Sequence, residues 1–116
     1  MLRKIGFALL CLTGTAAPLA AAEQEVMLMG LGYFPDEVYV SIGDVVTFVN
    51  ASTVPMSATA TDASWDSGVL QPGDRFELQV TDGMTGNFGD TYNANSSAAG
   101  LIDYVNPAPL ELENNF

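Results

Sequence analysis

The stretch Gly43-Asp44-Val45-Val46-Thr47-Phe48-Val49-Asn50 (GDVVTFVN) reads as a turn followed by a strand. Gly43-Asp44 is a turn-forming pair, and the next five residues are all β-branched or aromatic, as strand residues commonly are. An alternating segment, residues 38–42 (VYVSI), precedes the turn, and a polar loop, residues 50–55, follows the strand. The stretch therefore predicts a fold built from short strands separated by turns.

Strand-like runs continue along the chain in both directions from this stretch. The strand candidates are residues 25–31, 38–42, 45–49, 57–61, 76–80, 88–92 and 101–105. No segment after residue 22 has the i, i+3, i+4 spacing of apolar residues that marks an amphipathic helix. About seven short strands predict an all-β sandwich or barrel. Met27 and Met29 share one face of the first candidate, and we expect both to fill core space.

The N-terminal segment has the order of features of a secretory leader. Arg3-Lys4 precedes an apolar run, and Ala20-Ala21-Ala22 ends the segment with small residues. This order predicts a signal peptide over residues 1–22 and a periplasmic or secreted protein, and the apolar run is shorter than a transmembrane helix requires. We expect a domain over residues 23–105 and an acidic, proline-containing tail over residues 106–116. Whether the leader is cleaved or retained as an anchor stays open.

Charge narrows the classes of partner. After residue 22 the chain keeps one basic residue, Arg75, against 14 acidic residues, and it loses its single cysteine, Cys11. Nucleic acids and anionic membrane surfaces are excluded as partners because they carry the same sign of charge. We expect a protein partner with a cationic face, drawn by electrostatic steering. The alternative is that the acidity serves solubility alone.

Further motifs follow in a fixed order from Phe34 to Tyr104. They are Phe34-Pro35, Val38-Tyr39-Val40, the stretch at 43–50, Trp65-Asp66-Ser67-Gly68, Leu70-Gln71-Pro72-Gly73-Asp74-Arg75-Phe76, Gly86-Asn87-Phe88 and Gly100-Leu101-Ile102. Their order and spacing resemble those of the cupredoxins, the blue-copper family that includes plastocyanin, amicyanin and pseudoazurin. The resemblance implies a cupredoxin-like Greek-key β-sandwich.

The same resemblance implies which residues stand at the copper-ligand positions. Counted between Gly86 and Gly100 without a gap, Tyr92 falls at the cysteine, Asn95 at the second histidine and Ala98 at the methionine. Met56 falls at the first histidine. A blue-copper site needs one thiolate and two imidazoles, and the chain has no histidine and no cysteine after Cys11. We therefore expect no type 1 copper, no zinc site of the usual nitrogen and sulfur type, and no other cofactor.

These positions lead to a hypothesis of function. We expect a non-enzymatic exported protein that works as a binding or accessory module, with Met56, Tyr92, Asn95 and Ala98 as its interaction surface. Catalysis is not expected, because no histidine or lysine after residue 22 can activate a nucleophile. One alternative is a methionine-based copper-handling or electron-transfer-associated periplasmic protein, with Met56 as the Cu(I) candidate. Another is a subunit of an envelope assembly. Whether Trp65 joins the surface or the core stays open.

Overall fold

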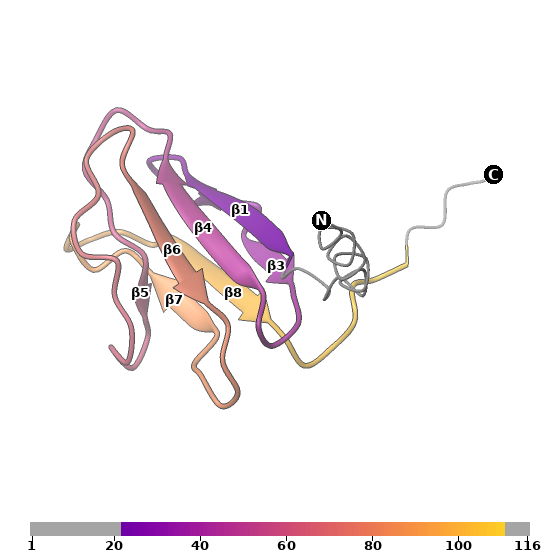
Figure 1. Cartoon of the computed structure of the whole chain (residues 1–116). Helices are drawn as coiled ribbons and strands as arrows, with labels where there is room; N and C mark the ends of the chain where they lie inside the picture. The colour runs from indigo at the N-terminus through magenta and orange to yellow at the C-terminus, as the bar shows by residue number, and fades with distance from the viewer. Residues whose placement is uncertain (1–21, 111–116) are drawn as a thin grey trace, which may run out of the picture.

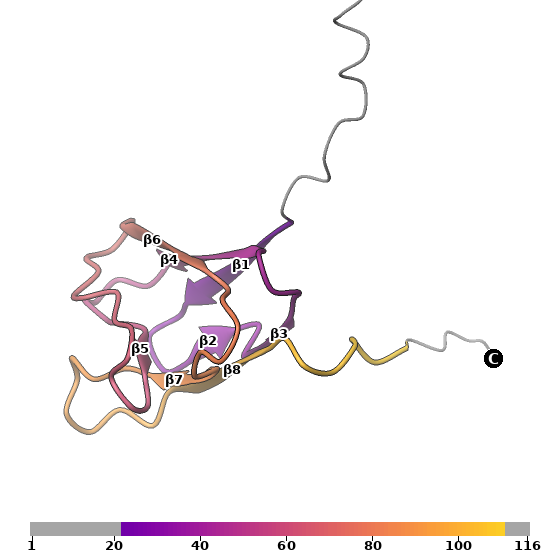
Figure 2. The ribbon, with the colours of Figure 1, turned by 60° about the horizontal axis from the view of Figure 1, so that its bottom comes forward.

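A computed structural model describes residues 22–110, which form two four-stranded sheets packed face to face (Figures 1 and 2). The strands are β1 (Glu23–Leu28), β2 (Tyr33–Phe34), β3 (Glu37–Tyr39), β4 (Val45–Asn50), β5 (Thr59–Ala60), β6 (Arg75–Gln79), β7 (Asn87–Gly89) and β8 (Ala99–Asp103). The first sheet has the order β2-β1-β4-β6, and the second has the order β3-β8-β7-β5. No helix occurs within residues 22–110, so the predicted all-β sandwich is confirmed.

Both sheets are mixed. β1 runs parallel to β4, and β3 runs parallel to β8, whereas the other pairs are antiparallel. Between β2 and β7 the chain changes sheet at every connection. The connections therefore bridge the two sheets at the ends of the sandwich, and side chains distant in sequence meet there.

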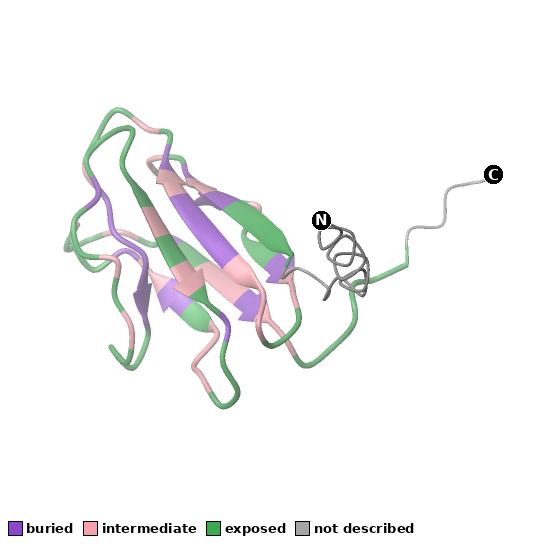
Figure 3. Ribbon diagram, in the orientation of Figure 1, coloured by how far each residue is buried: buried purple, intermediate pink, exposed green. Residues whose placement is uncertain are grey.

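The core lies between the sheets and is centred on aromatic rings. Phe48 of β4 packs edge-on against Phe88 of β7, with ring centroids 5.3 Å apart. Trp65 lies over both rings, and its Nε1 donates to the carbonyl of Thr85 at 2.8 Å. Trp65 thus packs against the core. Burial is most continuous along β4, where consecutive residues are buried (Figure 3).

The two glycines used to align the motifs stand where no side chain fits. A Cβ on Gly100 would lie 2.2 Å from the ring of Phe88, and one on Gly86 would lie 2.2 Å from the carbonyl oxygen of Ile102. Protein interiors are close-packed, so overlaps of this size cannot be absorbed without moving a strand. Both glycines are therefore required by the approach of β7 and β8.

Each predicted strand differs from its observed bounds by one to three residues at one end or both, and three differences are the most informative. β2 is an additional two-residue strand, which brings the described strands to eight. β1 occupies Glu23–Leu28 instead of residues 25–31, because the chain turns at Gly30, whose φ is +95°. β7 ends at Gly89 instead of residue 92. Sequence periodicity identified the strands but not where tertiary pairing stops.

The prediction that Met27 and Met29 fill core space is wrong. Val26 and Leu28 are fully buried on the inner face of β1, whereas Met27 is partly exposed and Met29 is 50% exposed. The register pairs Val26 with Phe48 on β4, and this pairing directs the opposite face of β1 outward. Both faces of β1 are apolar in sequence, so alternation alone could not distinguish them.

The C-terminal part of the domain leaves the sheet after β8. Residues 105–110 are exposed and carry no strand, and residues 106–110 are the described part of the predicted tail. The rest of that tail and the predicted signal peptide up to residue 21 lie outside the described residues. Between residues 22 and 110 we find no helix with the length and apolar character to cross a bilayer.

Candidate functional site

Two connections meet at one end of the sandwich: one crosses from the first sheet to the second, and the other joins two neighbouring strands of the second sheet. The β4–β5 connection carries Met56, and the β7–β8 connection carries the other three predicted positions, at residues 92, 95 and 98. Asn93 Nδ2 donates to the carbonyl of Pro55 at 3.1 Å, and the backbone N–H of Ser57 donates to Asp90 at 3.1 Å. The fold therefore brings together the two segments that the sequence comparison singled out.

Met56 and Ala98 are buried beneath this end. Met56 has no exposed surface, its Sδ accepts the N–H of Gly30 at 3.1 Å, and its backbone pairs with Leu70 in both directions. Ala98 is also buried and carries no donor atom on its side chain. Of the four residues expected to form an interaction surface, these two instead fill the interior below it.

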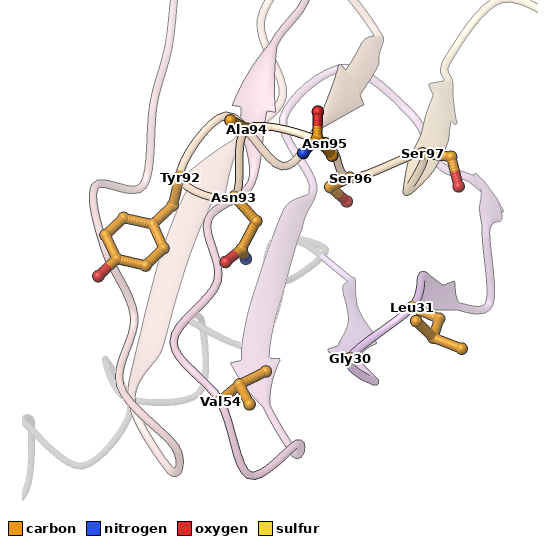
Figure 4. A pocket seen from close by; sticks show the side chains of 9 residues that line it. All are labelled: Gly30, Leu31, Val54, Tyr92, Asn93, Ala94, Asn95, Ser96 and Ser97. Atoms are coloured by element: carbon orange, nitrogen blue, oxygen red, sulfur yellow. The ribbon is translucent and has the colours of Figure 1, made fainter.

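Tyr92 and Asn95 reach the surface, where they line an open hollow of about 750 Å³ (Figure 4). Leu31 and Val54 form its apolar side, and Leu31 is 92% exposed. The full lining consists of Gly30, Leu31, Val54, Tyr92, Asn93, Ala94, Asn95, Ser96 and Ser97. No residue of this lining is charged, although the chain carries a net charge of −11.

Asp90 is the residue of this end that the sequence analysis missed. It is 8% exposed, and its Oδ1 accepts the backbone N–H groups of Ser57 at 3.1 Å, Tyr92 at 2.9 Å and Asn93 at 3.3 Å. Its Oδ2 accepts Asn93 Nδ2 at 2.6 Å. Phe88 is buried on the inner face of β7, and the two-residue period of a strand places Asp90 on the same side.

Hydroxyl groups extend this network below the hollow. Ser57 Oγ accepts the N–H of Thr91 at 3.0 Å and lies 3.1 Å from Thr59 Oγ1. Tyr33 Oη donates to the carbonyl of Ser57 at 2.7 Å. Burial raises the pKa of the Tyr33 phenol well above its ordinary value, and the nearby charge of Asp90 adds to the rise. Tyr33 therefore remains a donor throughout the neutral pH range.

The residues present do not fit a blue-copper ion. Neither a thiolate nor an imidazole exists after residue 22, so the ligand set that type 1 copper requires is missing. Within residues 22–110 no group of three or more histidine, cysteine, aspartate or glutamate side chains is arranged to hold a metal. The Met56 sulfur accepts the Gly30 N–H, and Met84 lies with Tyr104 near the end of β8, so these two thioethers lie at different ends of the sandwich.

Comparisons with solved structures identify the fold. A purple cupredoxin from Nitrosopumilus maritimus superimposes with a TM-score of 0.59 at 20% identity, covering 69% of this chain and 97% of that chain. The oxidized form of an amicyanin variant superimposes with a TM-score of 0.61 at 20% identity, covering 76% and 87%. A Cu(I) form of another amicyanin variant gives a TM-score of 0.59 with the same identity and coverage.

No family model and no curated protein matches the chain at the level of sequence. The structural likeness covers the greater part of each of these chains, and the fold is the one that the motifs of residues 34–104 imply. The protein therefore has the cupredoxin fold, without the residues that bind type 1 copper in that family.

Proposed function

We propose that this protein is an exported, non-enzymatic cupredoxin-fold module that binds a partner protein through the hollow lined by Tyr92 and Asn95. It acts in the periplasm or outside the cell. The observation that carries the proposal is the division of the four former ligand positions. Two fill the interior with apolar atoms, and two line an uncharged surface hollow.

The hollow has the composition of a docking surface. On a soluble protein, a contiguous exposed apolar surface with a polar rim often marks an interaction site. Tyr92 is 50% exposed, and tyrosine often contributes heavily to binding because it combines a large apolar ring with a polar tip. The hollow is open and shallow, which suits a protruding side chain or loop of a partner better than an enclosed small molecule.

The negative charge of the protein indicates which sign of charge its partner carries. Arg75 is the one basic residue between residues 22 and 110, and it forms an exposed ion pair with Glu25 at 3.7 Å. The remaining acidic side chains give the molecule a negative field that attracts a cationic face and repels anionic ones. The uncharged hollow then supplies the contact itself, where buried charge would be costly.

A site-specific photo-crosslinker tests the proposal in the cells that produce the protein. The crosslinker replaces Ala94, an exposed residue of the hollow, and the control carries it at Thr81, an exposed residue outside the hollow. We expect a discrete protein product from position 94 alone. Equal products at both positions, or none at position 94, would show that the hollow does not dock a protein.

Binding of the captured partner then provides a quantitative check. Tyr92→Ala should raise the dissociation constant at least about tenfold, because truncating an aromatic hot spot typically costs about 2 kcal/mol or more. Tyr39→Ala, which removes a tyrosine that does not line the hollow, is the matched control. The association rate should fall as salt screens the acidic surface. An unchanged affinity for Tyr92→Ala would contradict the proposed surface.

A further inference from the structure

Asp90 is a buried carboxylate without a cation. Arg75, which forms its ion pair with Glu25, is the one basic residue among residues 22–110, so hydrogen bonds alone stabilise the Asp90 side chain. A buried charge is costly unless its oxygens are well supplied with donors. Backbone and side-chain donors reach both oxygens here. A buried carboxylate with its donors in place restricts the chain to one conformation more strongly than an apolar side chain of similar size would.

The donors come from two distant parts of the chain. Ser57 lies 33 residues before Asp90, whereas Tyr92 and Asn93 follow it directly. Asn93 makes a second link, since its Nδ2 contacts both Asp90 Oδ2 and the carbonyl of Pro55. Asp90 therefore fastens the β4–β5 connection to the first turn of the β7–β8 connection.

The hydrogen bonds of Asp90 lie beside the positions that the resemblance assigns to the copper ligands. Ser57 follows Met56 in sequence, and Tyr92 stands at the position that the resemblance assigns to the copper cysteine. A metal ion coordinated from both segments would have joined them, because metal binding contributes directly to folding free energy. The two segments now carry no such ligands, and the Asp90 carboxylate joins them instead.

We propose that Asp90 is the positioning residue of the hollow: without a metal ion, it fixes the backbone of Tyr92 and Asn93 and so presets the surface that Tyr92 and Asn95 present. The use of that surface for docking rests on the proposed function, whereas the fixing of the loop does not. A preset loop loses less conformational entropy on binding, so the partner needs fewer contacts for the same affinity.

Asp90→Asn tests this role with little change in shape. A carboxamide has one accepting and one donating end. Either orientation therefore places an NH₂ group against a donor, facing the backbone N–H groups on one side or Asn93 Nδ2 on the other. We expect hydrogen exchange of the Tyr92 and Asn93 amides to accelerate at least about tenfold, with much smaller changes at Phe48 and Phe76 in the paired strands β4 and β6.

Asp66→Asn is the matched control. Asp66 accepts from Thr59 Oγ1 at 2.9 Å and from the N–H of Gly68 at 2.8 Å, close to the same network, but it makes no hydrogen bond to residues 90–93. It should leave exchange at Tyr92 and Asn93 unchanged. The inference is overturned if Asp90→Asn leaves these two amides as slow as in the unmodified protein, or accelerates them no more than Phe48.

A second variant covers the case in which Asp90→Asn does not fold. Asn93→Ala keeps Asp90 and removes only the two hydrogen bonds of Nδ2. We expect it to fold and to accelerate exchange at residues 92 and 93 by about threefold to tenfold, and unchanged rates would again overturn the inference. Exchange decides the role of Asp90, and affinity for the captured partner decides docking, so either proposal can fail while the other stands.

Discussion

The two ends of the sandwich use carboxylates in different ways. At the hollow end, buried Asp90 holds segments that lie 33 residues apart. At the opposite end, Asp103 accepts the N–H groups of Val105 and Asn106, two and three residues further on. Asp62 accepts from Ser64 and from Thr85 Oγ1 and is exposed. The carboxylate at the hollow end is therefore buried, whereas the carboxylates at the opposite end make hydrogen bonds in exposed positions, where water can compete for them.

A pair of methionine truncations should give the largest contrast between the ends. Met56→Ala removes a fully buried side chain at the hollow end and should lower the free energy of unfolding by about 3 kcal/mol. Met84→Ala, at the opposite end and partly exposed, should cost about 1 kcal/mol. Urea denaturation followed by tryptophan fluorescence measures both changes. Equal losses would show that the two ends are packed to a similar degree.

A pair of aspartate truncations should give the next largest effect. Asp90→Ala leaves the buried N–H of Ser57 and the partly buried N–H of Tyr92 without their acceptor, which should cost about 2 kcal/mol. Asp103→Ala removes only local contacts at the end of β8 and should change stability by less than about 0.5 kcal/mol. Thermal unfolding monitored by circular dichroism compares them. A larger loss for Asp103→Ala would reverse the distinction between the two ends.

The smallest effect should be a pH dependence of stability that comes from Asp62, at the end opposite the hollow. Hydrogen bonds from Ser64 and Thr85 lower the pKa of Asp62 from 3.8 to about 2. Because the folded-state pKa is below the unfolded value, the stabilisation is complete above pH 3.8 and is lost as the pH falls toward 2. Asp62→Asn should therefore flatten the acid limb of the stability curve between those values. An unchanged acid limb would mean that Asp62 does not contribute to it.

Local sequence signals predicted much of the architecture. Alternation and turn residues located seven of the eight described strands, and the stretch at residues 43–50 coincides with β4 and its preceding turn. β2 was missed because two residues, Tyr33 and Phe34, are too short to show a period. The outward placement of Met29 could not be predicted, since it depends on which face of β1 meets Phe48.

The candidate site was predicted only in outline. The motif register placed Met56 and Tyr92 on two segments that do meet, because glycines at 86 and 100 constrain the spacing. The same register could not show that Met56 turns inward to Gly30 while Tyr92 turns outward, since side-chain direction depends on the path of each connection. Asp90 looked like one more surface acid, because single-sequence patterns carry no information on long-range donors.

The sequence by itself determined that no thiolate or imidazole follows residue 22, and with it the absence of the type 1 copper ligand set, because ligand identity is a matter of residue type. Only the tertiary structure decided which former ligand positions became interior and which became surface. It also decided that Asp90 joins the β4–β5 and β7–β8 connections. Such contacts arise where separate segments are brought together by the packing of two sheets, and no local pattern encodes that meeting.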